Sequence, residues 1–174
     1  MENENRFIVE SLGKANIPSP IKMSNTQGDM RVNYVKDDEA VLYDILGKSG
    51  ERRKTYRQDE LLQLAGPREM LYFSPGHVHA GIVTCGGLCP GLNDVIRSIV
   101  RTLWYSYGVK RITGIRNGYK GLLSSYGFTP IRLDPDVVDD IHKVGGTILG
   151  TSRGGGEKTE EIVDTLERLN LNIL

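Results

Sequence analysis

The sequence predicts an α/β fold, the N-terminal part of a mostly parallel, Rossmann-like sheet with flanking helices, preceded by an irregular extension. Three observations predict it. Apolar runs alternate with segments of helical periodicity from residue 80 onward, glycine-rich loops follow these runs, and residues 1–79 lack strong periodicity. Strands that alternate with helices are typical of parallel βαβ units. We therefore divide the chain into a weakly structured extension, 1–79, and an α/β domain, 80–174.

The first expected strand and helix surround a glycine-rich loop. The apolar run 80–84 is suited to a buried strand. Asn93 is the expected N-cap of the helix, Asp94 lies in its positively polarised first turn, and Gly108 ends it. The apolar side chains of this helix recur at helical spacing and are Val95, Ile96, Ile99, Val100, Leu103, Trp104 and Tyr107.

The middle of the domain repeats this alternation. A second strand is expected at 111–116, followed by a turn at 117–121. A shorter helix follows Pro135 and stops at Gly145, and a third strand is expected at 147–152. The side chains of the shorter helix expected to point inward are Val137, Val138, Ile141 and Val144.

The last part of the chain completes the pattern. A further helix carries one apolar stripe, and residues 171–174 are expected to begin a fourth strand. The stripe consists of Ile162, Val163, Leu166 and Leu169.

Composition limits the classes of function. The 22 basic and 22 acidic residues cancel, which argues against bulk nucleic-acid binding. No apolar run approaches the roughly 18 residues that a membrane span needs. The acidic start, MENENRFIVE, resembles neither a secretory signal nor a transit peptide, so we expect a cytoplasmic protein. The basic stretch 47–54 is expected to be a solvated loop, with a phosphate or regulatory contact as the alternative.

The two cysteines, Cys85 and Cys89, do not predict a metal or redox site. Structural zinc usually has four ligands, often with CxxC spacing, and dithiol redox pairs also use CxxC, whereas this spacing is CxxxC. Three histidines could complete a zinc set on paper, but they do not cluster in the sequence. They are His77, His79 and His142. We expect two small side chains beside a tight loop and no metal ligands.

Three loops follow strand candidates and are expected at one edge of the sheet, where α/β proteins bind ligands. In the first, GGLCPG, the glycines 86, 87 and 91 permit close backbone approach to an anion ahead of a helix. The loop matches neither the Walker A nor the GxGxxG motif. A plain tight turn is the alternative.

The loop SRGGG strengthens the prediction of an anion site. Its three glycines can form a backbone nest, and Arg153 supplies a permanent cation for phosphate oxygens. Alone it could be a flexible linker, but with the first loop it favours a polyphosphate site. Phosphoryl transfer also needs metal-binding carboxylates, and we expect none here. The acidic residues Asp134, Asp136, Asp139 and Asp140 are expected to form a solvated helix start.

Taken together, GIVTCGGLCPGLNDVIRSIV, NGYKGL and GGTILGTSRGG resemble ATP-dependent 6-phosphofructokinase, most closely the plant type. The segment AGPRE also resembles the plant enzymes, so the likeness runs from about residue 65 to residue 174. The resemblance implies transfer of the γ-phosphoryl group of ATP to the 1-hydroxyl of fructose 6-phosphate, with Mg²⁺.

The resemblance also implies roles for individual residues. Gly86 and Gly87 would approach the ATP phosphates through their backbone, Tyr119 would lie beside the nucleotide, and Arg153 and Gly154 would line its site. Arg153 would be the catalytic residue that stabilises charge on the transferring phosphoryl group.

Two arginines match positions that bind an effector in bacterial relatives. Arg97 and Arg101 lie on the first helix of the domain, and a solvated helix face is the alternative. Leu88 stands where the bacterial enzymes have aspartate. Since this form also occurs in pyrophosphate-using relatives, ATP and pyrophosphate remain open as donors.

The chain stops at Leu174, ahead of the family's GGDG-type and TIDND-type segments. Those segments carry the metal-linked aspartate and the catalytic base, and the fructose 6-phosphate site is built from later residues. We therefore expect a truncated chain that is inactive alone. The alternative is a non-catalytic remnant that binds nucleotide or pairs with full-length subunits as an interaction module. The partners expected are further copies of this chain or full-length subunits.

Overall fold

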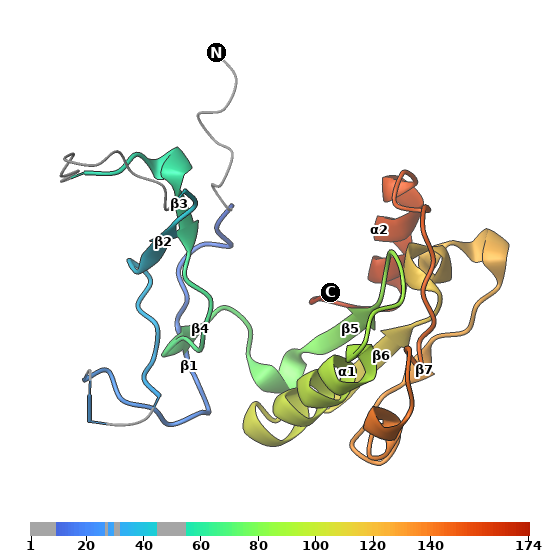
Figure 1. The fold of residues 1–174 in the computed structure, drawn as a ribbon, viewed down its shortest axis with the longest axis horizontal. Helices are drawn as coiled ribbons and strands as arrows, with labels where there is room; N and C mark the ends of the chain where they lie inside the picture. Colours follow the sequence, from blue (N-terminus) through green and yellow to red (C-terminus); the bar gives the residue numbers. More distant parts are fainter. Residues whose placement is uncertain (1–9, 27, 30–31, 45–54) are drawn as a thin grey trace. The chain divides into compact units, whose positions relative to one another are not determined.

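The computed structural model describes residues 10–26, 28–29, 32–44 and 55–174 (Figure 1). The chain forms two compact units, Met1–Tyr72 and Phe73–Leu174. The boundary expected after residue 79 lies a few residues beyond this division. The basic stretch 47–54 lies outside the described residues.

In its described residues, the first unit contains two short antiparallel strand pairs. Strand β1 (Ile17–Pro18) pairs with β4 (Met70–Leu71). Strand β2 (Ala40–Leu42) pairs with β3 (Leu61–Gln63), which directly follows a short 3₁₀ helix, η1 (Gln58–Glu60). Irregular segments connect these pairs.

The second unit is built on a three-stranded sheet in the order β5-β6-β7 (Figure 1). Strands β5 (His79–Val83) and β6 (Arg111–Ile115) are parallel, whereas β7 (Ile131–Arg132) runs antiparallel to β6. An isolated parallel bridge joins Ala80 to Ile173 on the other side of β5. The predicted α/β class is confirmed, and β5 and β6 lie within one residue of the predicted strands.

The third predicted strand, 147–152, is wrong. The segment forms a turn in which the N–H of Gly150 donates to the carbonyl of Thr147 at 3.1 Å. Leu149 is buried against Gly114 of β6, on the face of the sheet. The apolar residues of this segment therefore cover the sheet and do not extend it.

Two α-helices complete the unit, α1 (Leu92–Arg101) and α2 (Thr159–Arg168). A π-helical turn, η3 (Thr102–Ser106), continues α1 toward the expected end at Gly108. The expectation that Asn93 caps α1 is wrong. The N-cap is Gly91, whose left-handed backbone (φ 88°) suits a residue without a Cβ. The remaining 3₁₀ helices of this unit are η2 (Pro75–His77), η4 (Gly118–Leu122), η5 (Ser124–Tyr126) and η6 (Ile141–Lys143).

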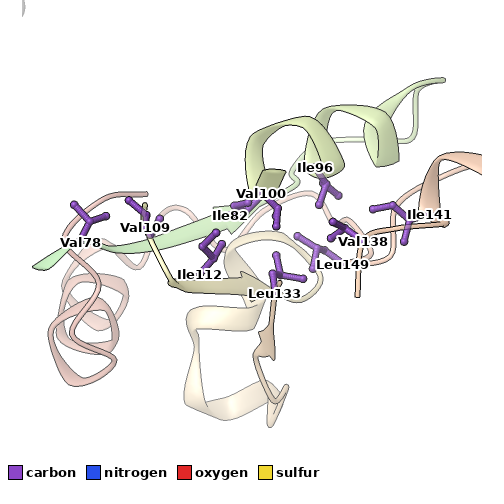
Figure 2. Packing of buried hydrophobic residues seen from close by; sticks show 11 residues of the cluster. Val78, Ile82, Ile96, Val100, Val109, Ile112, Leu133, Val138, Ile141 and Leu149 are labelled. Atoms are coloured by element: carbon purple, nitrogen blue, oxygen red, sulfur yellow. The ribbon is translucent and has the colours of Figure 1, made fainter. Parts of the chain in front are cut away.

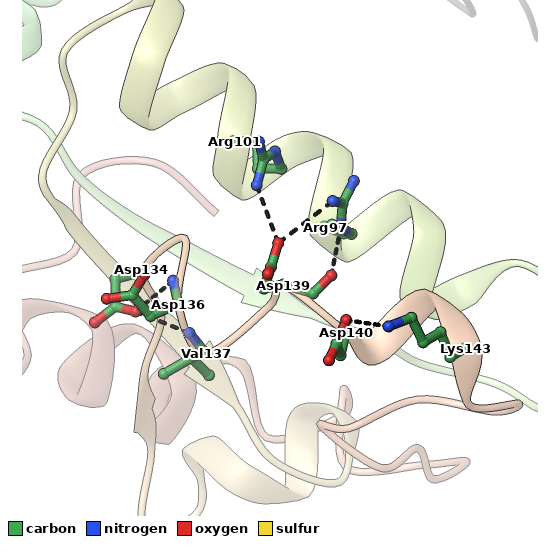
Figure 3. A network of polar contacts seen from close by, with 8 residues as sticks. All are labelled: Arg97, Arg101, Asp134, Asp136, Val137, Asp139, Asp140 and Lys143. Carbon is green, nitrogen blue, oxygen red and sulfur yellow. Dashed lines mark hydrogen bonds and ion pairs between the residues drawn. The ribbon is translucent and has the colours of Figure 1, made fainter.

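The α-helix expected after Pro135 is not formed, and turns lead into the short helix η6. The Asp134 carboxylate accepts the N–H groups of Asp136 at 3.1 Å and Val137 at 3.0 Å (Figure 3). Such local side-chain bonds compete with helical hydrogen bonding. The four side chains expected to point inward therefore divide: Val138 and Ile141 are buried, but Val137 and Val144 are 44% and 64% exposed.

The two helices cover opposite faces of the sheet. Alternate residues of β5 and β6 pack under Ile96 and Val100 of α1, as Figure 2 shows. The opposite face packs against Ile162 and Leu166 of α2. Since successive strand residues point to opposite faces, both faces of this short sheet carry apolar side chains. Val163, expected on the inner stripe of α2, is exposed.

We predict that Gly121→Ala destabilises the second unit. A Cβ at Gly121 would overlap the carbonyl oxygen of Arg116, a backbone atom at the end of β6, and would lie 2.9 Å from Cγ2 of Ile115. Overpacking against fixed atoms costs roughly 1–3 kcal/mol. Urea unfolding measures the loss. Gly145→Ala is the control, because a Cβ there meets open space. Equal stability of both variants would contradict this packing.

We also predict that His79 makes the unit less stable in acid. Burial lowers the pKa of His79, and the charge of Arg111 lowers it further. Its Nε2 lies 2.8 Å from Oγ1 of Thr113. A histidine with a lowered pKa contributes stability that is present above its ordinary pKa of about 6.5 and is lost as the pH falls through the folded value. Melting temperature against pH should therefore fall more steeply below pH 6.5 for the wild type than for His79→Gln. Parallel curves would rule out this role.

Candidate functional site

Three loops meet beyond the carboxyl ends of β5 and β6. They are the loop 84–91 after β5, the helix η4 after β6, and the segment 150–156. The N–H of Gly86 donates to the carbonyl of Ser152 at 3.1 Å. In return, Nε of Arg153 donates to the carbonyl of Gly86 at 3.3 Å. This pair of hydrogen bonds joins the first loop to the third.

The loop after β6 is joined to the same segment. Oγ of Ser152 donates to the carbonyl of Asn117 at 2.6 Å, and the N–H of Asn117 donates to the carbonyl of Leu149 at 2.8 Å. Gly118 has a left-handed backbone (φ 66°), and a Cβ there would lie 3.0 Å from Oγ of Ser152. Only glycine fits this approach easily. The three loops that the sequence places at one edge therefore do come together.

Threonine hydroxyl groups form hydrogen bonds at the start of the third loop. Oγ1 of Thr84, at the end of β5, donates to the carbonyl of Gly150 at 2.7 Å and lies 3.1 Å from Oγ1 of Thr147. The hydroxyl of Thr151 is buried and has no hydrogen-bond partner in the described part of the chain. The hydrogen bond from Thr84 therefore fixes the first residue of the third loop, Gly150, whereas Oγ1 of Thr151 has no partner among the described residues.

The third loop contains the three glycines 154–156, which the sequence predicts to form a backbone nest and which are called the nest below. Gly154 and Gly155 both have left-handed backbones, with φ of 77° and 94°. A Cβ at Gly155 would lie 3.3 Å from the backbone nitrogen of Lys120, so the loop packs closely on η4. The N–H of Gly155 donates to Oε2 of Glu157 at 2.8 Å. Within the described residues, the N–H groups of Gly154 and Gly156 make no hydrogen bond.

Arg153 is exposed and lies beside the first loop. A Cβ at Gly87 would be 3.9 Å from Nη2 of Arg153. The guanidinium group makes no ion pair with any residue that the structure describes. Tyr119 of η4 completes the arrangement, because a Cβ at Gly156 would touch its ring at 3.5 Å. An unpaired cation beside available backbone N–H groups is suited to an anion with several oxygens.

Comparison with known proteins decides the family. The family described as Phosphofructokinase matches residues 79–174. The chain belongs to the phosphofructokinase family. An ATP-dependent 6-phosphofructokinase of Borreliella burgdorferi is 50% identical over 176 residues, which cover 100% of this chain and 38% of the relative. ATP-dependent 6-phosphofructokinase 7 of Arabidopsis thaliana is 46% identical over 89% of this chain and 30% of its own length.

The likeness extends to other organisms. The ATP-dependent 6-phosphofructokinase of Trypanosoma cruzi is 54% identical over 114 residues, which cover 66% of this chain and 23% of the relative. The solved structure of Pichia pastoris phosphofructokinase in the T-state matches with a TM-score of 0.49 and 23% identity, over 57% of this chain and 10% of that chain. The chain spans about a third of the length of the curated relatives it matches most fully.

The structure brings most of the predicted site residues of this phosphofructokinase chain to the edge where the loops meet. They are Gly86, Gly87, Tyr119, Arg153 and Gly154. Cys85 and Cys89, in the first loop, are both exposed and unpaired. No three histidine, cysteine, aspartate or glutamate side chains gather into a possible metal site in the described ranges. Among the helices described, none is long and apolar enough to cross a membrane.

The two predicted effector residues lie elsewhere, on the side of α1 that faces the turns before η6 (Figure 3). Both point to Asp139, in the turns before η6. Nε of Arg97 donates to the Asp139 carbonyl at 2.9 Å, and its Nη2 lies 3.6 Å from Oδ1. Nη1 of Arg101 lies 3.4 Å from the same Oδ1. The carboxylate therefore pairs with both cations on this face.

Sequence reasoning missed the role of Asn93. Its side chain is 2% exposed, and its Nδ2 donates to the carbonyl of Val144 at 2.8 Å. Its Oδ1 accepts the N–H of Ile148 at 2.9 Å. Asn93 thus connects the start of α1 to the segment that leads into the third loop. The signal in the sequence was a polar residue one turn ahead of the buried Ile96, which we interpreted as a cap.

We predict that Asn93→Ala destabilises the second unit by about 1–3 kcal/mol, because it removes two part-buried hydrogen bonds, one to the carbonyl of Val144 and one from the N–H of Ile148. Chemical unfolding measures the loss. Ser98→Ala is the matched control, since Ser98 lies exposed on the same helix. If Asn93→Ala costs no more than the control, the two hydrogen bonds do not hold the segment.

Proposed function

We propose that this chain supplies the ATP-binding part of an ATP-dependent 6-phosphofructokinase. The enzyme would transfer the γ-phosphoryl group of ATP to the 1-hydroxyl of fructose 6-phosphate and release ADP. The observation that carries the proposal is the Arg153 guanidinium beside the first glycine loop, which makes no ion pair with the described residues. The names of the relatives, which are ATP-dependent 6-phosphofructokinases, support the choice of donor and acceptor.

The residues present fit a polyphosphate. The loops offer glycine backbone without side chains at Gly86, Gly87 and Gly154, and N–H groups of the nest are available. Nε of Arg153 is held by the carbonyl of Gly86, which leaves its Nη groups for phosphate oxygens. A guanidinium can donate two parallel hydrogen bonds to a phosphate. Tyr119, whose ring lies beside Gly156, would line the nucleotide.

In this arrangement Arg153 would act on charge. A cation oriented before the reaction stabilises negative charge as it develops on the transferring group, without reorganisation at that moment. The hydrogen bond to Gly86 would provide the orientation, because it fixes the guanidinium against the loop that approaches the phosphates. Gly86 and Gly87 would contribute close backbone approach.

Mg²⁺ belongs to the proposed reaction, but the described residues contain no group of carboxylates that fits it. We therefore assign no metal ligand and derive no step through the ion. We also propose that Arg97 and Arg101 bind an effector. This binding would require an anionic ligand to replace the Asp139 carboxylate, which now pairs with both arginines.

The finer parts of the proposal have different support. The plant type rests on the resemblance of the sequence motifs alone, because the Borreliella burgdorferi relative is 50% identical whereas two Arabidopsis thaliana relatives are 46% and 45% identical. A cytoplasmic location stays a proposal that rests on the family resemblance, and some plant relatives carry chloroplastic names. Self-association or pairing with longer subunits is proposed from the resemblance, and light scattering tests it.

The proposal predicts that Arg153→Ala weakens ATP binding at least tenfold, because hydrogen bonds to charged groups contribute about 1.5–3 kcal/mol. Isothermal titration calorimetry with ATP measures this on the whole chain. Arg132→Ala is the control, since this exposed arginine of β7 carries the same charge and pairs with Thr113 in the middle of β6, before the carboxyl end where the loops begin.

Folding should be nearly unchanged in both variants. Binding within threefold of wild type for Arg153→Ala would contradict the assigned role, and a wild type that binds no ATP would contradict the proposed function. In a longer enzyme that contains this chain, the same substitution should lower kcat strongly.

A further inference from the structure

We infer that Glu157 is an internal competitor for the anion site: its carboxylate holds the backbone N–H of Gly155, and a bound polyphosphate displaces it. The inference rests on the proposed function, because it concerns the same nest. It adds a residue that sets how tightly, and for which anions, the site binds.

The Glu157 carboxylate lies where an oxygen of a ligand would accept the same hydrogen bond. Oε2 of Glu157 lies 2.8 Å from the N–H of Gly155, the central residue of the three-glycine nest. On either side, the N–H groups of Gly154 and Gly156 make no hydrogen bond in the described part of the chain. A nest of successive N–H groups binds anions, and here one of its donors is already occupied by a negative group.

The charges around the nest explain why this contact competes with a ligand. Glu157 makes no ion pair with the described residues, and the neighbouring Lys158 pairs with Glu161 at 3.7 Å. The cation of Lys120 lies over the ring of Tyr126, 5.5 Å from its centroid. Within the described residues, the Glu157 carboxylate therefore has no cationic side chain as a partner, and it accepts a hydrogen bond from the N–H of Gly155.

Displacement has two consequences for a ligand that reaches Gly155. The ligand must replace a charge-assisted hydrogen bond, which is roughly twice as strong as a neutral one. It must also approach a nearby negative charge, which opposes a polyanion. Glu157→Gln keeps an oxygen acceptor for Gly155 but removes the charge, so both penalties become smaller.

The test compares Glu157→Gln with wild type in the whole chain, by calorimetric titration with ATP and, separately, with inorganic tripolyphosphate. We expect both ligands to bind about fivefold to tenfold more tightly to the variant. Glu160→Gln is the matched control, because this exposed glutamate in the first turn of α2 has the same charge and no contact with the nest. It should change either affinity less than twofold.

The outcomes separate this inference from the proposed function. If wild type and Glu157→Gln bind ATP equally, the competition is wrong and the proposed function stands. An equal gain in Glu160→Gln would show a general charge effect and would also overturn the inference. If Glu157→Gln bound ATP more tightly than wild type does but bound tripolyphosphate equally, the effect would concern the nucleoside. That result would contradict displacement of the Glu157 carboxylate by phosphate. No binding by any variant would overturn both the inference and the proposed function.

A second measurement reports the contact directly. A short hydrogen bond to a carboxylate moves an amide proton downfield, so the Gly155 amide resonance should shift upfield in Glu157→Ala and stay in place in Glu160→Gln. An unchanged Gly155 resonance in Glu157→Ala would show that the hydrogen bond does not exist in solution.

Discussion

The candidate site depends on two hydrogen bonds that join the first loop to the third. The N–H of Gly86 donates to the carbonyl of Ser152, and Nε of Arg153 donates to the carbonyl of Gly86. These bonds connect loops that lie more than sixty residues apart in the chain. One bond fixes the backbone of the third loop, and the other fixes the guanidinium. Without them, Arg153 would be a long exposed side chain with many rotamers, and ordering it around a ligand would cost entropy. The two hydrogen bonds therefore hold the Arg153 guanidinium against the first loop.

The parallel strands β5 and β6 bring these loops close enough to form the two hydrogen bonds. Because β5 and β6 are parallel and in register, their carboxyl ends lie side by side, and the loops that follow them begin at the same edge. The turn at 148–149 then brings the third loop to that edge while Leu149 is buried on the face of β6. Asn93 holds this segment from the other side. Apolar burial and two amide hydrogen bonds thus position a loop that has no regular structure of its own.

The sequence was sufficient for β5, β6, α1 and α2, since each has an apolar pattern of one clear period. It failed at 147–152, where an apolar run resembled a strand but covers the sheet. It failed also after Pro135, where Asp134 captures the N–H groups that a helix would use. The loops that bear glycine and Arg153 were predictable because glycine has few other reasons to cluster. Glu157 was not, because a lone glutamate before a helix has no distinguishing pattern.

The central claim is that three loops form one anion site. A titration of ¹⁵N-labelled chain with ATP, followed by amide resonances, tests it most directly. The amides of Gly87, Tyr119 and Gly154, one from each loop, should shift together and saturate with a single Kd, while that of Ser98 on the exposed face of α1 stays in place. Shifts that saturate with different Kd values, or that involve only one loop, would show that the loops do not bind a common ligand.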